Sequence, residues 1–277
     1  MTDRESKSRI KYKKAKISDL SKRSKSMKPV KDKTIKTEEK PQQLQPVSSS
    51  KPERQRFILP SDPSIIVLAG KPKSGKSYAI RSIMYSCAKQ GHFKFGICLT
   101  ATKFNGDYDY LPDKHVWQGY DEARLEKYID HLRQKTKEIK DKQGSKAQLP
   151  PNFVILDDLL GRIDMYSSFF ANWVSTYRHT NTTIFITAQQ LKRGISTTMR
   201  ECTTFCFMFR TVFKDSVTAL YESYGQLFED FEDFKENFIK VTSVDHQALV
   251  FHNDQNNFDE TYCTWIAESA PDFKLKY

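Results

Sequence analysis

Short runs of apolar, often β-branched residues recur along the chain, separated by stretches with helical periodicity. Apolar runs of this length, bounded by Gly, Pro or polar residues, predict buried strands. Strands that alternate with helices along a sequence indicate an α/β fold with a central, mainly parallel sheet. The strands expected from this pattern cover residues 64–69, 94–100, 152–156, 182–188, 203–209 and 245–251.

Helical periodicity follows the first apolar run, at residues 78–85, and is clearest at 121–140, where apolar residues recur every third or fourth position. Two further helices are expected at 214–224 and 228–238. Residues 102–120 are rich in turn-forming and aromatic residues. The end of the chain, 253–277, predicts a strand that ends at Trp265 and then a polar, loose terminus.

The segment between the first strand and the first helix has the sequence GKPKSGKS, which fits the phosphate-binding P-loop pattern GxxxxGK[ST]. Gly70 and Gly75 allow the tight turn that collects backbone N–H groups on one concave face. Lys76 can reach the β- and γ-phosphates, and the Ser77 hydroxyl can ligate Mg²⁺. We therefore expect ATP to contact this motif and the residue after it: Gly70, Lys73, Ser74, Gly75, Lys76, Ser77 and Tyr78.

Polar residues end two later apolar runs. Asp157 and Asp158 follow residues 153–156, at the end of a strand where open α/β sheets bind ligands. We expect Asp157 to hold Mg²⁺ and Asp158 to polarise the attacking water. Gln189 follows the 182–188 run and could contact the γ-phosphate or that water. The structural alternatives are a helix cap after a strand for the acids and a polar turn for Gln189.

Two arginines are candidates for stabilising the charge that develops during phosphoryl transfer. Arg178 precedes the 182–188 run, and Arg200 precedes the 203–209 run. If subunits form a ring, either could reach the nucleotide of a neighbour, and the order along the chain favours Arg200. The alternative is that both pair with surface carboxylates.

The chain of 277 residues has a net charge of +11, and all of this excess lies in residues 1–56. That segment holds 18 Lys or Arg and 7 acidic residues, whereas residues 57–277 hold 27 of each. Its low apolar content predicts a disordered basic arm before a single ATPase domain at 57–277. The arm either contacts nucleic acid or serves as a nuclear address, or it is a solvated arm with an assembly role. We expect no membrane span, because no apolar run is long enough.

Five segments together give the chain a family resemblance: GKPKSGKS, ICLTATKF, FVILDD, YRHTNTTIFITAQQ and GISTTMRECTTFCFMF. In these the sequence resembles the poxvirus-type genome-packaging ATPases, within the FtsK–HerA group of P-loop ATPases, over about residues 60–255. The resemblance implies a RecA-like sandwich and an oligomeric ring that hydrolyses ATP to pump double-stranded DNA into a preformed capsid. It also implies capsid proteins as partners, and a location in the cytoplasm or nucleus of an infected host cell or in the virion.

By motif position the resemblance assigns roles to Lys76, Ser77, Asp157, Asp158 and Gln189, with Arg200 as the arginine finger. Many relatives in the wider group carry Glu where this chain has Asp158, so the shorter side chain is a departure at the general base. The sequence also leaves open a nucleotide or small-molecule kinase and a non-translocating, nucleic-acid-binding ATPase. A GTPase is disfavoured, because no NKxD motif follows.

Overall fold

The predicted apolar runs assemble into one sheet in the computed structural model, which describes residues 59–159, 161–189, 191, 195–253 and 261–275. In this part of the chain the sheet has eight strands in the order β3-β2-β4-β5-β1-β6-β7-β8. The first six strands in this order, from β3 to β6, pair in parallel. Strand β7 pairs antiparallel with both of its neighbours, β6 and β8. The strands are β1 Ile65–Ala69, β2 Phe95–Thr100, β3 Val116–Gln118, β4 Asn152–Asp157, β5 Thr182–Ala188, β6 Phe205–Met208, β7 Gln247–His252 and β8 Tyr262–Ile266.

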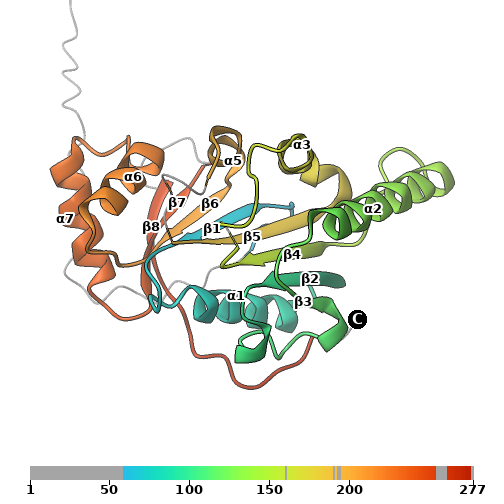
Figure 1. Ribbon diagram of the computed structural model, residues 1–277, viewed down its shortest axis with the longest axis horizontal. Helices are drawn as coiled ribbons and strands as arrows, with labels where there is room; N and C mark the ends of the chain where they lie inside the picture. Colours follow the sequence, from blue (N-terminus) through green and yellow to red (C-terminus); the bar gives the residue numbers. More distant parts are fainter. Residues whose placement is uncertain (1–58, 160, 190, 192–194, 254–260, 276–277) are drawn as a thin grey trace, which may run out of the picture. The chain divides into compact units, whose positions relative to one another are not determined.

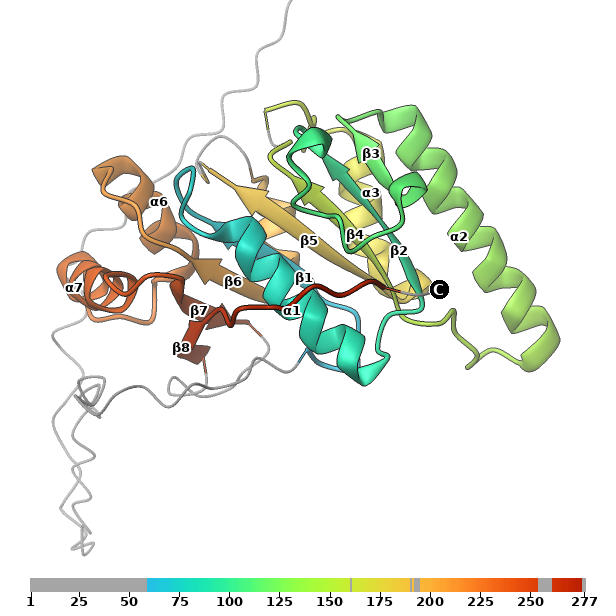
Figure 2. The same ribbon diagram turned by 90° about the horizontal axis from the view of Figure 1, so that it is seen from below.

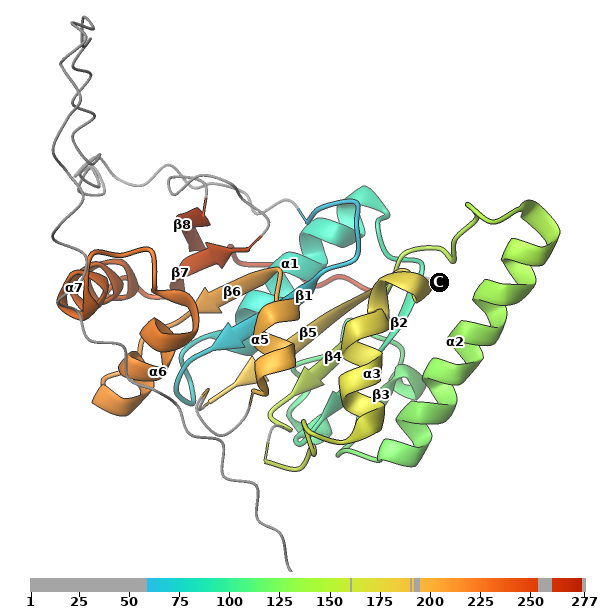
Figure 3. The ribbon, with the colours of Figure 1, turned by 90° about the horizontal axis from the view of Figure 1, so that it is seen from above.

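Helices cover both faces of this sheet (Figure 1). Helix α1 lies on one face, as Figure 2 shows, and α3 and α5 lie on the other, as Figure 3 shows. Because both faces are covered, strands such as β1 and β5 are buried along their whole length and read as continuous apolar runs. The helices are α1 Lys76–Gln90, α2 Glu122–Gln143, α3 Ser168–Thr176, α5 Thr197–Cys202, α6 Lys214–Tyr224 and α7 Phe231–Thr242.

Local capping explains where the helices begin. The Asp121 carboxylate accepts the Arg124 N–H at 3.0 Å, and α2 starts directly after it, as predicted. Helix α7 was predicted from residue 228 but begins at Phe231, because Asp230 caps it by accepting the Asp233 N–H at 2.9 Å. The pattern did not predict the shorter helices α3 and α5 or the short strand β3.

The prediction of a loose C-terminus was wrong for the described residues 267–275. These residues cross α1 as an extended segment, which we call the C-terminal strap (Figure 2). Its Glu268 N–H donates to the Ser82 hydroxyl of α1 at 3.0 Å, and its Leu275 side chain is buried. The Phe273 ring stacks on Tyr110, with centroids 4.8 Å apart. The segment is polar in composition, but three apolar or backbone contacts are enough to hold it.

The expected α/β sandwich with a mainly parallel sheet is confirmed. The predicted basic arm, residues 1–56, lies outside the described residues, so the arm and the domain boundary at residue 57 stay predictions. Among the residues that the structure describes, no helix combines the length and apolar character needed to cross a bilayer.

Candidate active site

The order of the strands brings the predicted site residues to one edge of the sheet. Strand β5 lies between β1, which leads into the P-loop, and β4, which ends in the two carboxylates. Because all three run parallel, their carboxyl ends lie side by side. The Gly70 N–H donates to the Ala188 carbonyl at 2.9 Å, which fixes the start of the P-loop against the end of β5. Gln189 therefore follows β5 between the P-loop and the carboxylates.

The P-loop glycines meet two separate structural demands. Gly75 has φ +96°, a left-handed conformation that disfavours any side chain, and it directly precedes α1. Gly70 has no room for a Cβ atom, which would lie 2.6 Å from the Ser74 hydroxyl and 2.8 Å from the Phe209 Cβ. The loop thus closes tightly in front of the amino end of α1, where backbone N–H groups and the helix dipole favour an anion.

Lys76 is the first residue of α1, and its side chain is buried across the P-loop. Its ammonium donates to the Gly70 carbonyl at 2.8 Å and to the Lys71 carbonyl at 2.9 Å. Burial lowers the pKa of Lys76, and the charges of Asp157 and Asp158 oppose this shift. The ammonium is therefore held by backbone carbonyls inside the loop, where phosphate oxygens could replace them as stronger, charge-assisted partners.

Asp157 ends β4 and is buried, with both carboxylate oxygens in hydrogen bonds. Oδ1 accepts the Thr187 hydroxyl at 2.9 Å, and Oδ2 accepts the Thr100 hydroxyl at 3.2 Å. Burial raises the pKa of Asp157 above its ordinary value, and these hydrogen bonds act in the opposite direction by favouring the ionised form. Sequence reasoning missed both threonines, although each stands at the carboxyl end of a predicted strand.

Asp158 differs from Asp157 in its exposure, its backbone conformation and its hydrogen-bond partners. It is exposed, and its backbone has φ +53°, which non-glycine residues rarely adopt. Its N–H donates to the Thr187 hydroxyl at 2.8 Å, so Thr187 holds both acids. The Gln189 side-chain amide donates to the Asp158 carboxylate. The predicted water-polarising pair is thus brought together at the open edge of the sheet.

The side chains at this edge suit Mg²⁺ and a nucleotide. Ser77 lies in the first turn of α1 and supplies a hydroxyl oxygen, and Asp157 supplies a carboxylate. Hard oxygen donors of this kind are the ligands that Mg²⁺ prefers. The Tyr108 hydroxyl, like those of Thr187 and Thr100, favours the ionised form of Asp157. A carboxylate has about four acceptor sites, so one stays open to a cation, which would neutralise a charge that burial otherwise penalises.

The two predicted arginines lie at the opposite edge of the sheet. Arg178 belongs to the short 3₁₀ helix Tyr177–Thr180, just before β5, and Arg200 belongs to α5, just before β6. Thr204, which follows α5, pairs with Ile65, the first residue of β1. Five residues of extended β1 separate that level from the P-loop, or about 16 Å. Within one chain, therefore, neither arginine is brought to the P-loop.

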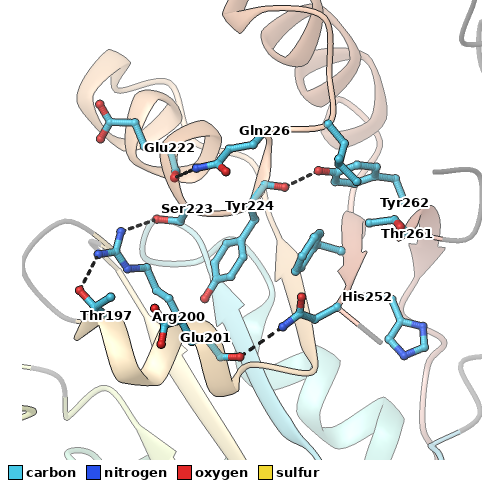
Figure 4. A pocket seen from close by; sticks show the side chains of 13 residues that line it. Thr197, Arg200, Glu201, Glu222, Ser223, Tyr224, Gln226, His252, Thr261 and Tyr262 are labelled. Carbon is cyan, nitrogen blue, oxygen red and sulfur yellow. Dashed lines mark hydrogen bonds between the residues drawn. The ribbon is translucent and has the colours of Figure 1, made fainter. Parts of the chain in front are cut away.

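Arg200 instead lines a cavity of about 660 Å³ beside α6 and β7 (Figure 4). Its guanidinium donates to the Thr197 hydroxyl at 3.2 Å and to the Ser223 hydroxyl at 3.5 Å. Glu201 and Glu222 also line this cavity. Arg178 lies near the end of α5, since its charge opposes the effect of burial, which raises the pKa of the Cys202 thiol. Both arginines therefore belong to one surface at the amino ends of the parallel strands.

Comparisons with known proteins identify the family of the chain. The family model described as "Poxvirus A32 protein" matches residues 53–223, which include the P-loop, both acids, Gln189 and both arginines. A curated relative, "Uncharacterized protein L437" of Acanthamoeba polyphaga mimivirus, is 28% identical over 199 residues. That match covers 69% of this chain and 67% of the relative.

Solved structures share the fold at low sequence identity. The genome-packaging NTPase B204 of Sulfolobus turreted icosahedral virus 2, in complex with AMPPCP, has a TM-score of 0.51 at 15% identity. The match covers 76% of this chain and all of that one. The pCW3 conjugation coupling protein TcpA, with ATPγS, has a TM-score of 0.53 at 16% identity and covers 78% of this chain and 62% of that one. The predicted class, a P-loop ATPase, is confirmed.

Proposed function

Because the chain belongs to the poxvirus A32 protein family, we propose that it is an ATP-driven motor that moves double-stranded DNA into a preformed viral capsid. One observation carries the enzymatic part of this proposal: the carboxyl ends of β1, β5 and β4 place Lys76, Gln189 and the two acids at one edge. The packaging role is supported by the likeness to B204, which is itself described as a genome-packaging NTPase. Under this proposal the protein acts in an infected host cell.

Each side chain at the edge has a defined role in hydrolysis. The P-loop N–H groups and Lys76 hold the phosphates in line for attack. Ser77 and Asp157 would hold Mg²⁺, which would supply positive charge to the phosphate oxygens. Asp158 accepts a proton from the attacking water, and Gln189, in contact with that carboxylate, orients the water. The left-handed backbone of Asp158 is the kind of strain that persists where function requires it.

The partners of the motor follow from the same proposal. Double-stranded DNA is the substrate that is moved, and capsid proteins anchor the motor at its portal. A homo-oligomeric ring explains how Arg200 or Arg178, remote from the P-loop of its own chain, acts on nucleotide bound by a neighbour. The basic arm, with its net charge of +11, is a second site for DNA phosphates.

ATP hydrolysis by the purified full chain, with and without double-stranded DNA, tests the proposal. We expect DNA to stimulate hydrolysis several-fold. We expect Asp158→Asn to lower both the basal and the stimulated rate by about 10²–10⁴-fold, the usual effect of losing a general base. Asp141→Asn, an exposed acid in α2, is the matched control and should behave as wild type. A hydrolysis rate that is the same with and without DNA would contradict the proposal of a DNA motor. Full activity in Asp158→Asn would contradict the assignment of Asp158 as the general base.

A further inference from the structure

The turn between α7 and β7, residues 243–246, lies directly against the P-loop. A Cβ atom on Gly75 would be 3.1 Å from the Nδ1 atom of His246. The His246 ring also packs on Tyr78, with centroids 4.4 Å apart and planes inclined by 31°. Tyr78 follows the P-loop immediately, so a residue from the far end of the chain contacts both sides of the phosphate-binding turn.

The fold holds His246 in this position. Its carbonyl accepts the Ala267 N–H at 3.0 Å, and the next residue, Gln247, donates its N–H to the Val244 carbonyl at 3.2 Å. Gln247 is also the first residue of β7 and pairs with Ile266 of β8. His246 itself has φ +61°, a conformation that L-residues seldom adopt. An exposed imidazole in a strained backbone, fixed from both sides beside a nucleotide site, suggests a functional contact.

A cavity of about 280 Å³ opens between this turn and the P-loop. Three cationic side chains line it, Lys71, Lys73 and Arg210, with one acidic side chain, Asp245, and with His246 and Gln247. The Gln247 side chain is only 5% exposed, and its Oε1 atom has no hydrogen-bond partner among the described residues. A buried acceptor without a partner is costly in a folded protein, so a ligand that donates a hydrogen bond would satisfy it.

The position of the cavity indicates which part of a nucleotide it takes. Lys76 serves the β- and γ-phosphates, so the α-phosphate and ribose must leave the P-loop along the first turn of α1. Tyr78 stands in that turn, and His246 packs on it. Aromatic rings offer a stacking surface for a base, cations suit the phosphate end, and an amide oxygen accepts from an exocyclic amino group.

We propose that the ribose and base of the bound nucleotide occupy this cavity, stacked against the His246 ring, which packs on Tyr78, with Gln247 Oε1 accepting from the amino group of adenine. This inference rests on the proposed ATPase function and adds to it a base-reading element outside the P-loop. At C6 adenine carries an amino group and guanine a carbonyl oxygen, whereas the amino group of guanine is at C2, so an acceptor that faces C6 favours ATP over GTP.

Binding of three probes to the full chain tests the proposal: ATP, GTP and inorganic tripolyphosphate, which has no base or ribose. The main variant is His246→Asn, because Asn tolerates a positive φ but has no ring to stack. We expect His246→Asn to weaken ATP binding by about tenfold, the loss typical of one base-stacking ring, and to leave tripolyphosphate binding unchanged. His131→Asn, an exposed histidine of α2, is the matched control and should bind ATP as wild type does.

The three probes separate this inference from the function on which it rests. Unchanged ATP binding in His246→Asn would overturn the base contact, as would equal losses for ATP and tripolyphosphate, which would indicate a distorted P-loop instead. GTP binding as tight as ATP binding would overturn the role of Gln247. If the wild-type protein binds neither ATP nor tripolyphosphate, the nucleotide site itself is overturned, and the base contact with it.

Discussion

Thr187 connects the two acids on which the proposed chemistry depends. Its hydroxyl donates to the buried Asp157 carboxylate at 2.9 Å and accepts the Asp158 N–H at 2.8 Å. One side chain on β5 therefore orients the proposed metal-binding acid and also the backbone of the proposed general base. Its neighbour Thr183 lies four residues earlier on the same strand, is equally buried, and makes no contact with either acid.

We predict that Thr187→Val moves the acid limb of the pH–rate profile to higher pH. Asp157 must be ionised to hold Mg²⁺, and activity is lost as pH falls through its pKa. Burial already raises that pKa, and the hydrogen bond from Thr187 lowers it, so removing the bond raises the pKa further. Hydrolysis rates measured across the acid range would show the shift, and chemical unfolding should show a loss of about 1–3 kcal/mol.

Thr183→Val is the control for this prediction. The Thr183 hydroxyl accepts the Ser64 N–H at 3.4 Å, far from the carboxyl ends of the strands, so this variant should lose some stability but keep the wild-type pH profile. An acid limb that shifts equally in both variants, or in neither, would show that Thr187 does not govern the ionisation of Asp157.

At the level of elements, the C-terminal strap joins α1 to the segment that follows β2. Arg81 of α1 forms ion pairs with Asp109 at 2.6 Å and with Asp272 of the strap at 3.3 Å. Its guanidinium carbon lies 5.6 Å from the centroid of the Phe273 ring. The strap also binds the segment after β2, since Leu275 N–H donates to the Tyr110 carbonyl at 2.8 Å. The P-loop helix and the β2 side of the sheet are thus tied together.

We predict that Phe273→Ala lowers the free energy of unfolding by about 1–2 kcal/mol, less than for a fully buried ring, because Phe273 is half-buried between Tyr85 and Tyr110. Urea unfolding measures the change. Phe104→Ala removes a ring that is 82% exposed and should change stability by less than about 0.5 kcal/mol. Equal stability of the Phe273→Ala variant and wild type would mean that the strap does not hold α1.

The strap also illustrates what sequence patterns can and cannot predict. Continuous apolar runs fix strands such as β1 and β5 because burial on both faces leaves little choice of residue. A segment held by one ring, one aliphatic side chain, the ion pair of Asp272 with Arg81 and backbone N–H groups has no periodic signal from which it could be predicted. The prediction of short helices fails for the same reason, since α3 has only nine residues over which a periodic pattern could show. Its Ser167 cap, which accepts the Phe170 N–H at 3.2 Å, is nevertheless a recognisable start signal.

The candidate site residues could be named from the sequence, but their arrangement in space could not be predicted. Motifs identified Lys76, Asp157, Asp158 and Gln189, because phosphate and Mg²⁺ chemistry restricts the residue types. The strand order that inserts β5 between β1 and β4 is a long-range property, and it alone places Gln189 between the P-loop and the acids. His246 comes from a turn about 170 residues after Gly75, and no local pattern links such distant segments.

At the scale of the whole molecule, the two edges of the sheet hold what the proposed function requires to be complementary parts of one catalytic unit. The carboxyl edge carries the P-loop and the acids, and the amino edge carries Arg178 and Arg200. An arginine that completes the site from its own chain would have to cross the length of β1, about 16 Å, which a side chain cannot span. The arginine of a neighbouring subunit in a ring meets no such limit.

We predict that Arg200→Ala lowers ATP turnover by about 10³-fold or more, the usual effect of losing an arginine finger, without weakening ATP binding. Lys76→Ala should also be inactive, because the phosphates lose their cation. Mixing the two inactive proteins should restore part of the activity, since an intact P-loop from an Arg200→Ala subunit can then meet an intact Arg200 from a Lys76→Ala subunit. Arg133→Ala, on the surface of α2, is the control and should remain active alone. Mixed assemblies that stay inactive at every ratio would contradict a finger supplied in trans by Arg200, and rescue by Arg178→Ala in its place would assign the role to Arg178.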